Sequence, residues 1–385
     1  MELNPKNIPD YIHEQLEIGV FSADAEIVAE EIGDGNLNFV FRVYDVNEPS
    51  NSIVLKHAPP YIKILGPSYE LTPDRLTYES RALEVYNRLV PEHSPNQIHF
   101  HPQNYVIAME DLKDYHILRL DLIEGMVNPR ISEHIARFMA ITHSRTHAHN
   151  LRSDEAESYA SRFDNHVMQG ITADYVFTKP FINDPTNFYT EGLESQVGTL
   201  KGDQQLLSQI DHLKKIFLTS KQGLTHGDLH TGSVMVRGDS AKVIDSEFVF
   251  YGPVGFDMGL YWANYLLSYF SHVESTPVRT KLKTAIQRAW EIYEAEFEMD
   301  DGDRKAEVLK RIFHESVGFT GMEMMRRLIG AAHVRDIEGI KDIAKKLAVE
   351  IATLEFGSKL VKNHHEIGTM PEFMTYLESN SSGGL

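Results

Sequence analysis

The sequence predicts an α+β fold with two lobes, a β-rich N-terminal lobe and a mainly helical C-terminal lobe. Short runs rich in Val, Ile, Phe and Tyr, separated by Gly and Pro turns, are concentrated before residue 111. Beyond that point, long stretches show the apolar period of helices. A chain of 385 residues also exceeds one ordinary domain. We expect lobes at residues 1–111 and 112–378 and a disordered Ser/Gly tail at 379–385.

The N-terminal lobe is expected to begin with a short helix from Pro9 to Glu17 and then to build a sheet. Five strands are expected, at residues 25–32, 37–46, 52–56, 98–100 and 105–109. The first strand alternates acidic and apolar residues, which is typical of an edge strand. A helix over 72–90, opened by Pro73 and ended by Pro91, separates the third strand from the fourth.

The C-terminal lobe shows the helical period most clearly in four stretches, at residues 131–146, 204–218, 277–297 and 305–328. No internal repeat interrupts them. We therefore expect a single helical lobe.

Composition excludes several classes of function. The formal net charge of −19 repels phosphate backbones, so we expect no nucleic-acid partner. No stretch is apolar enough to cross a membrane, and the first ten residues are polar. The absence of cysteine excludes disulfides and cysteine-bound zinc and suits a cytoplasmic protein.

The strongest chemical signal is LTHGDLHTGSVMV at 224–236, followed by KVIDSE at 242–247. A loop carrying Asp228 leads into two apolar strands joined by a Gly-Asp turn. Asp245 and Glu247 stand two apart where the second strand ends, so they share one face and suit a hard cation such as Mg²⁺. Phosphoryl transfer from ATP needs such a metal pair and a separate carboxylate to deprotonate the attacking hydroxyl. Asp228 is the expected catalytic base and is expected to contact the acceptor substrate.

The N-terminal lobe carries weaker signals for ATP. Gly33 and Gly35 allow the backbone around Asn36 and Asn38 to approach the phosphates closely, although the same residues also suit a plain hairpin turn. Lys56 ends the third expected strand.

Lys56 stands where it can contact the α- and β-phosphates, and Glu79 on the next helix can pair with it. Backbone groups at Glu110 and Leu112 are expected to meet adenine at the hinge between the lobes.

Two further clusters imitate ligand sites. His143 and His147 lie one helical turn apart like zinc ligands, but a packed and capped helix end is the favoured interpretation. Met322, Met324 and Met325 are expected to fill the core.

HGDLH together with VIDSE resembles the aminoglycoside-phosphotransferase and choline-kinase group, relatives of the protein kinases. The resemblance implies a protein-kinase-like fold in which Asp257 braces the catalytic loop. Only the residues 246–256 separate Asp245 from Asp257, which leaves no room for a platform that binds peptides. A small-molecule acceptor is therefore expected.

The likeness is greatest to the 5-methylthioribose kinase family of methionine salvage, and it spans nearly the whole chain. It rests on GDGNLN, HGDLHTGS, DSE followed by FYGPVGFD, VFTKPF and GMEMMRRLIGAAHVRD. It implies transfer of a phosphoryl group from ATP to the anomeric 1-hydroxyl of 5-methylthioribose, with 5-methylthioribose 1-phosphate and ADP as products. It also implies a homodimer.

Three details of the site depend on this likeness. Ser233 stands where general relatives carry an asparagine that binds metal, so it is a weaker expected Mg²⁺ ligand. Tyr69 replaces a tryptophan in a loop that closes over the substrate. Arg326 and Arg327 match arginines that bind the sugar, although consecutive helix positions point about 100° apart and are not expected to share a face.

Two alternatives remain. One is another small-molecule kinase of this fold, of choline, homoserine or aminoglycoside type; adjacent arginines oppose its cationic acceptors. The other is a catalytically dead nucleotide-binding regulator, which the joint presence of Asp228, Asp245, Glu247 and Lys56 opposes.

Overall fold

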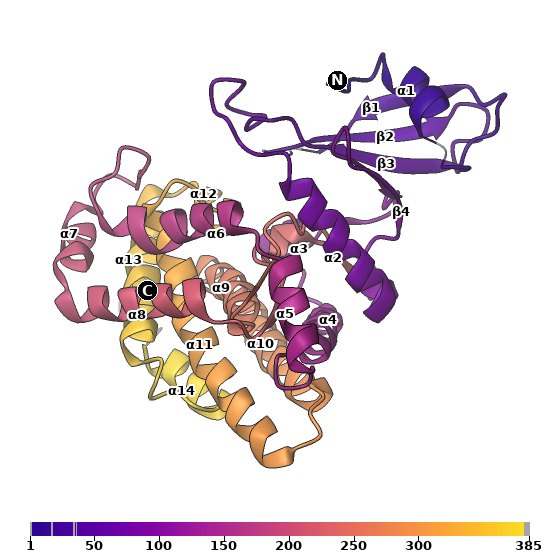
Figure 1. Ribbon diagram of the computed structural model, residues 1–385. Helices are drawn as coiled ribbons and strands as arrows, with labels where there is room; N and C mark the ends of the chain where they lie inside the picture. Colours follow the sequence, from indigo (N-terminus) through magenta and orange to yellow (C-terminus); the bar gives the residue numbers. More distant parts are fainter. Residues whose placement is uncertain (1, 17, 34, 36, 381–385) are drawn as a thin grey trace. The chain divides into compact units, whose positions relative to one another are not determined.

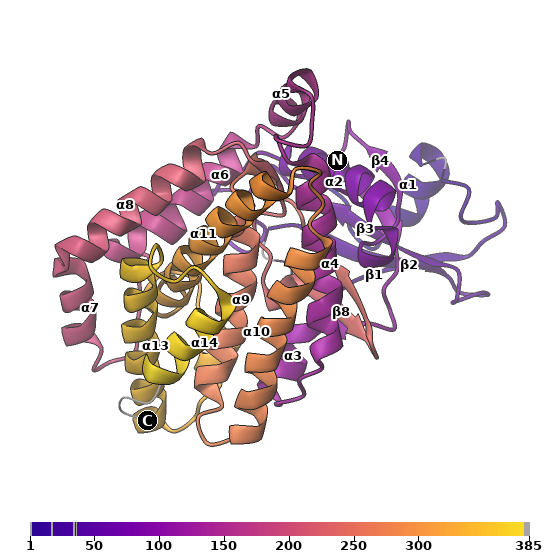
Figure 2. The same ribbon diagram turned by 90° about the horizontal axis from the view of Figure 1, so that it is seen from below.

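The computed structural model describes residues 2–16, 18–33, 35 and 37–380 (Figures 1 and 2). The chain divides into two compact units. Unit 1 comprises Met1–Tyr115 and Ile244–Val249, and unit 2 comprises His116–Val243 and Phe250–Leu385. The boundary therefore falls beyond the expected one at 111/112. The segment 244–249 joins unit 1 although it is distant in sequence, because packing and not chain order defines a compact unit.

Unit 1 is an antiparallel five-stranded sheet in the order β1-β2-β3-β5-β4, with β1 at an edge as predicted. Its strands are β1 (Ile27–Glu31), β2 (Phe39–Asp45), β3 (Ser52–His57), β4 (Gln97–His101) and β5 (Val106–Glu110). Its helices are α1 (Ile8–Gln15), α2 (Arg75–Leu89) and the short η1 (Pro91–His93). All five strands were predicted.

The alternation of apolar residues gives this sheet two buried faces. On β3, Ile53 and Leu55 pack in one cluster with residues of α1, while Val54 points to the opposite face, towards Leu76 and Leu83 of α2. Successive strand residues point to opposite faces, so one apolar run serves both helices.

Unit 2 is mainly helical. Its helices are α3 (Leu118–Ile123), α4 (Pro129–Thr146), α5 (Ser153–Arg162), α6 (His166–Thr172), η2 (Ala173–Thr178), η3 (Lys179–Phe181), α7 (Glu194–Gly202), α8 (Gln204–Thr219), η4 (Thr231–Ser233), α9 (Gly255–Ser271), α10 (Thr276–Glu296), α11 (Gly302–Ile329), α12 (Arg335–Glu338), α13 (Ile343–Asn363) and α14 (Met370–Asn380). Its strands are β6 (His116–Ile117), β7 (Gly223–Thr225), β8 (Val234–Arg237), β9 (Ser240–Val243) and β10 (Phe250–Gly252). Within the described residues, no helix is both long and apolar enough to span a membrane.

Helix α9 forms the centre of unit 2. Helix α11 packs on α9 and α13, and α10 packs on α4 and α9 (Figure 2). The four predicted helical stretches correspond to α4, α8, α10 and α11. No helical period marked α9, because nearly all of its residues are buried and it has no polar face to alternate with an apolar one.

The end of the chain differs from expectation. Ser379 and Asn380 were assigned to a disordered tail, but they complete α14. The Asn380 side chain accepts a hydrogen bond from Lys359 Nζ at 3.2 Å and donates one to the Tyr376 carbonyl at 2.9 Å. These contacts extend the helix through residues of low apolar content. Residues 381–385 lie outside the described part.

Candidate active site

The loop that carries Asp228 follows β7 and is held from below by a buried aspartate. Asp257, at the start of α9, accepts hydrogen bonds from the backbone N–H groups of His226 at 2.6 Å and Gly227 at 2.9 Å. Gly227 has a φ of 84°, which favours glycine. The predicted bracing role of Asp257 therefore matches its contacts.

His143 and His147 belong to the packing beneath this loop. His143 is buried between Tyr293 and Asp257, at 3.0 and 3.1 Å. His147 caps the end of α4, and burial lowers its pKa to about 3. The interpretation as a packed helix end is confirmed for both histidines. Met322, Met324 and Met325 are likewise fully buried in the core.

The Asp228 side chain is 27% exposed. Loss of hydration raises the pKa of this carboxyl, and the positive charges of Arg327 and Arg326 oppose the increase. A carboxylate with a raised pKa is a better proton acceptor than an ordinary aspartate. The position and electrostatics of Asp228 suit a general base.

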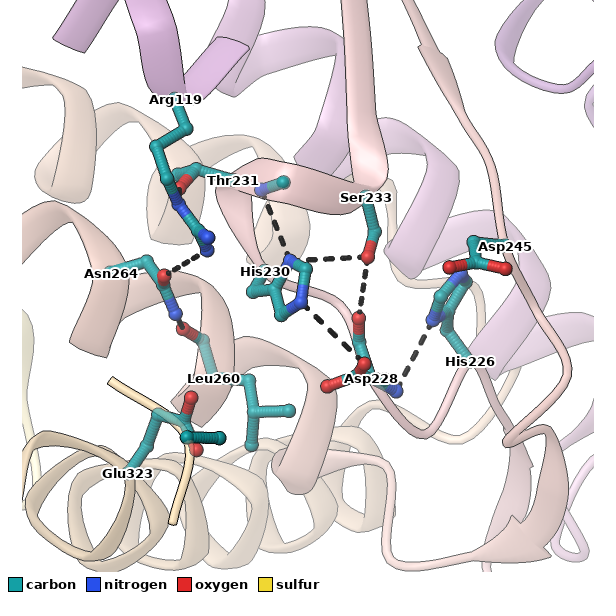
Figure 3. Close-up of polar contacts among 12 residues, drawn as sticks. Arg119, His226, Asp228, His230, Thr231, Ser233, Asp245, Leu260, Asn264 and Glu323 are labelled. Atoms are coloured by element: carbon teal, nitrogen blue, oxygen red, sulfur yellow. Dashed lines mark hydrogen bonds and ion pairs between the residues drawn. The ribbon is translucent and has the colours of Figure 1, made fainter. Parts of the chain in front are cut away.

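The imidazole ring of His230 lies beside the Asp228 carboxylate. Its Nδ1 accepts the backbone N–H of Gly232 at 3.0 Å, so the ring proton of the neutral form is on Nε2. Nε2 lies 3.5 Å from Asp228 Oδ2 (Figure 3). Burial and the charge of Arg119 lower the pKa of His230, which keeps the ring neutral.

Ser233 is bonded within its own loop. Its hydroxyl donates to the Asp228 carbonyl at 3.0 Å and lies 3.1 Å from His230 Nδ1. The residue is buried. These contacts give Ser233 a loop-bracing role, which the expectation of a metal ligand did not include.

Arg326 and Arg327 contradict the expectation that they cannot share a face. Glu323 lies three and four residues before them on α11 and receives both guanidinium groups, each through Nε at 2.6 Å. Long side chains on adjacent positions can converge on a carboxylate one turn earlier. The two arginines lower the pKa of Glu323 to about 2 despite its burial. Both also act on the charge of Asp228.

Unit 1 holds a second charged cluster around Lys56. The predicted ion pair between Lys56 Nζ and Glu79 Oε2 is present at 2.6 Å, and Lys56 also contacts Asp245. Lys56 is buried, and the surrounding carboxylates raise its pKa against the effect of burial. The lysine therefore remains charged.

Asp245 and Glu247 were expected at the end of a strand, but they lie beyond it. Strand β9 ends at Val243, and Asp245 has a φ of 68°, so the chain turns there. The turn separates their environments: the Asp245 side chain is 48% exposed and that of Glu247 only 3%. Burial and the charge of Asp245 raise the pKa of Glu247 to about 8.

Arg75 is a residue that sequence reasoning missed. Its fully buried guanidinium donates to the Asn38 side chain at 3.0 Å and lies 3.4 Å from Glu247. It also donates to five backbone carbonyls, those of Leu37, Pro59, Tyr61, Leu71 and Thr72. An arginine at the start of a helix is usually solvated, and only burial distinguishes this one.

The other residues expected to bind nucleotide differ in how much of their side chain or backbone is available. Asn38 donates to Glu247 at 2.8 Å, so its side chain is engaged within the protein. A Cβ on Gly35 would lie 2.7 Å from the Asn38 carbonyl, which explains glycine there. Gly33 has a φ of 76°. Asn36 lies outside the described residues.

At the expected hinge, the Glu110 N–H already donates to the Asn96 carbonyl at 2.9 Å, and the Leu112 carbonyl accepts from Tyr115. The backbone groups of these two residues are thus partly used. Asp111, between these two residues, accepts hydrogen bonds from the side chains of Arg42 and Ser52, each at 2.7 Å. Tyr69 is exposed in its loop.

Comparison with known proteins identifies the family. The model of the phosphotransferase enzyme family matches residues 29–296. The chain belongs to this family. This phosphotransferase is 37% identical over 375 residues to the methylthioribose kinase of Geobacillus thermodenitrificans (strain NG80-2), covering 93% of this chain and 92% of the relative. It is also 37% identical over 381 residues to the methylthioribose kinase of Bacillus cereus (strain ATCC 10987 / NRS 248), covering 96% and 95%. Among solved structures, a choline kinase from Cryptosporidium parvum Iowa II has 14% identity and a TM-score of 0.49 over 98% of this chain and 97% of that one.

Two carboxylates of the phosphotransferase, those of Asp245 and Glu247, have the chemistry to bind Mg²⁺ together with nucleotide phosphates. Within the described part of the chain, no three His, Asp or Glu residues are grouped to hold a metal by themselves. Mg²⁺ commonly binds one or two carboxylates, with phosphates and water completing its shell. Three carboxylates around Lys56 act on the charge of this one lysine, and the charge of Asp245 adds to burial in raising the pKa of Glu247. Asp245 and Glu247 suit a divalent cation for this reason.

Proposed function

We propose that the chain is an ATP-dependent 5-methylthioribose kinase. It transfers the γ-phosphoryl group of Mg-ATP to the anomeric 1-hydroxyl of 5-methylthioribose, and the products are 5-methylthioribose 1-phosphate and ADP. The observation that carries this proposal is the grouping of Asp228 with Arg326 and Arg327 in unit 2. The names of the full-length relatives support this acceptor and a place in methionine salvage.

Unit 1 supplies the groups proposed to bind ATP. Lys56, aimed by Glu79, binds phosphate oxygens, as the corresponding pair does in kinases. Asp245 and Glu247 hold Mg²⁺, which neutralises charge on the phosphates when it is bound. The backbone near Gly33 and Gly35 approaches the phosphates, and backbone groups at Glu110 and Leu112 face adenine.

Unit 2 supplies the groups proposed to act on the acceptor. Asp228 takes the proton of the anomeric hydroxyl, which is more acidic than an ordinary alcohol and so needs only a carboxylate as base. Arg326 and Arg327 donate hydrogen bonds to the sugar and stabilise negative charge that develops during transfer. Tyr69 in unit 1 is proposed to contact the acceptor as well.

The acceptor is a neutral polyol in this proposal and not a cation. A site for choline or an aminoglycoside needs carboxylates or an aromatic cage to bind its positive charge. Two guanidinium groups that act on Asp228 would repel such a ligand. The enzyme is further proposed to be cytoplasmic and to form a homodimer. Its mass in solution tests the dimer.

A coupled assay of ADP release tests the proposed function. Purified protein with Mg-ATP is offered 5-methylthioribose, ribose and choline at equal concentration, with a no-acceptor control. We expect the highest kcat/KM with 5-methylthioribose and little turnover with choline. Preference for choline, or hydrolysis of ATP that no acceptor increases, would contradict the proposal.

A further inference from the structure

Arg119 of α3 lies against the loop that carries Asp228, although no sequence motif indicated it. Its Nε donates to the Thr231 hydroxyl at 3.2 Å, three residues after Asp228, and its Nη2 donates to the Asn264 side chain at 3.0 Å (Figure 3). Its Nε also lies 3.7 Å from Asp336 Oδ2. Three different elements therefore fix the plane of this guanidinium.

One edge of the Arg119 guanidinium remains unused. In the part of the chain that the structure describes, Nη1 has no hydrogen-bond partner. Nη1 lies 3.2 Å from the place that a Cβ on Gly232 would occupy. Glycine at position 232 therefore leaves room for the arginine beside the catalytic loop.

Arg119 contacts the loop three residues after Asp228, the proposed base, and its charge also acts on that carboxylate. Asp228 and Arg119 attract each other, and Arg119 and Arg327 repel each other. Burial and Arg327 together lower the pKa of Arg119 to about 10, which still leaves it charged at neutral pH. Holding a third guanidinium there costs free energy, because it is desolvated and adjacent to a like charge.

Asp336 offsets part of that cost. Its side chain is only 2% exposed and its charge stabilises the charged form of Arg119. Asp336 Oδ1 has no hydrogen-bond partner among the described residues. Burying a carboxylate with an unsatisfied oxygen costs folding free energy. The favourable interaction of Asp336 with Arg119 offsets part of this cost.

We propose that Arg119 is a further acceptor-binding residue, whose Nη1 donates a hydrogen bond to a ring hydroxyl of the sugar, and that Asp336 is its positioning residue. This inference rests on the proposed function. It assigns recognition of a second hydroxyl, away from the one that is phosphorylated, to a residue outside the Arg326-Arg327 pair. A guanidinium held by three elements selects a hydroxyl at one position, which a flexible lysine does not do.

The test compares Arg119→Lys with wild type on 5-methylthioribose and on its 2-deoxy and 3-deoxy analogues. Lysine keeps the charge and loses the fixed planar donor. We expect kcat/KM for 5-methylthioribose to fall about ten- to a hundredfold, with the KM for ATP nearly unchanged. The analogue that lacks the contacted hydroxyl should lose much less, because its contact is already absent.

Arg130→Lys is the matched control. Arg130 also pairs with a carboxylate, Asp239, at 2.6 Å, but its side chain is 70% exposed. The Arg130→Lys substitution should leave all kinetic constants near wild type. Asp336→Asn should reproduce part of the Arg119→Lys loss with the same dependence on the acceptor.

An equal loss with all three acceptors would overturn the inference, since it would show that Arg119 only braces the loop. Unchanged kinetics in Arg119→Lys would overturn it as well. Either result differs from failure of the proposed function, in which the wild-type protein itself does not phosphorylate 5-methylthioribose.

Discussion

At the scale of single residues, the environment of Asp228 decides what the site can do. Its carboxylate faces His230 Nε2, and the loop beneath it is held by Asp257. Its raised pKa comes from burial, and the pKa is kept from rising further by Arg327 and Arg326. The raised pKa makes this carboxylate a stronger proton acceptor than an ordinary aspartate.

Asp228→Ala should abolish transfer and leave ATP binding largely intact. The base acts on the acceptor hydroxyl, and the residues proposed to bind ATP lie in unit 1. We expect kcat to fall about 10²- to 10⁴-fold. Steady-state kinetics and an ATP dissociation constant from calorimetry measure both effects. Wild-type turnover in this variant would refute the assignment of the base.

Arg327→Gln should change the pH dependence of catalysis. The base works when ionised, so activity falls as pH drops through its pKa. Arg327 holds that pKa down, and its removal should raise it. The acid limb of kcat/KM for the sugar should therefore move to higher pH. Arg130→Gln serves as control, and an unmoved limb in Arg327→Gln would contradict the electrostatic role.

At the scale of elements, α11 connects the acceptor site to the core of unit 2. Its last turns carry Glu323, Arg326 and Arg327, and its middle packs on α9 and α13. The contact with α13 is close because glycines meet: a Cβ on Gly321 would lie 2.4 Å from the Gly357 carbonyl. The helix position, and with it the arginine pair, depends on this contact.

Gly321→Ala should destabilise the protein by about 1–3 kcal/mol, because the added methyl group forces α11 and α13 apart. Gly302→Ala, at the start of the same helix, meets nothing within 4 Å and should be neutral or slightly stabilising. Denaturant unfolding of both variants measures the difference. Equal stability of the two would show that the helices separate without cost.

Glu315 on α11 gives unit 2 a pH-dependent stability. Burial raises the pKa of Glu315 to about 7, while Gln222 donates to both carboxylate oxygens at 3.0 Å. The folded state then holds a proton that the unfolded state releases near pH 4.5. The contribution of Glu315 to stability is full below pH 4.5 and is lost as pH rises through 7.

Glu315→Gln should therefore increase Tm relative to wild type at pH 8.5, and this advantage should shrink towards pH 5.5. Thermal unfolding at several pH values measures it. Glu307→Gln, an exposed change on the same helix, should show no such trend. An advantage independent of pH would mean that Glu315 does not titrate in this range.

At the scale of the whole molecule, the proposed donor and acceptor groups segregate. Lys56, Glu79, Asp245 and Glu247 belong to unit 1, whereas Asp228, Arg326 and Arg327 belong to unit 2. The segment 244–249 follows the β8–β9 hairpin of unit 2 in sequence but belongs to unit 1. The proposed metal ligands Asp245 and Glu247 are therefore part of unit 1. A single sequence motif thus supplies both units.

This segregation predicts separable kinetic effects. Asp245→Asn should raise the Mg²⁺ concentration needed for half-maximal activity, because it removes a charged oxygen ligand, and should leave the KM for sugar near wild type. Arg326→Lys should raise the KM for sugar and leave the Mg²⁺ requirement near wild type. Titrations of Mg²⁺ and sugar on both variants measure this. An unchanged Mg²⁺ requirement in Asp245→Asn would exclude it as a ligand.

Much of the fold follows from local pattern. The five strands of unit 1 were predictable because each is a short apolar run bounded by turn residues, and α4, α8, α10 and α11 because each has a polar face. Helix α9 was not, because it is buried all round. The pairing of Lys56 with Glu79 and the bracing by Asp257 were expected and match the contacts.

The sequence by itself determined the residue types of the chemistry: a loop aspartate, two carboxylates after a hairpin, a strand lysine and an arginine pair. Tertiary structure alone decided how they are used. Burial distinguishes Arg75 and Arg119 from ordinary solvated arginines. The chain turns at Asp245 instead of continuing the strand before it. Glu323 pairs with both Arg326 and Arg327, so the two side chains converge on one side of α11. The physical reason is that desolvation and long-range pairing depend on neighbours that are distant in the chain. A local pattern shows which groups are present but not which of them lose water or meet a partner.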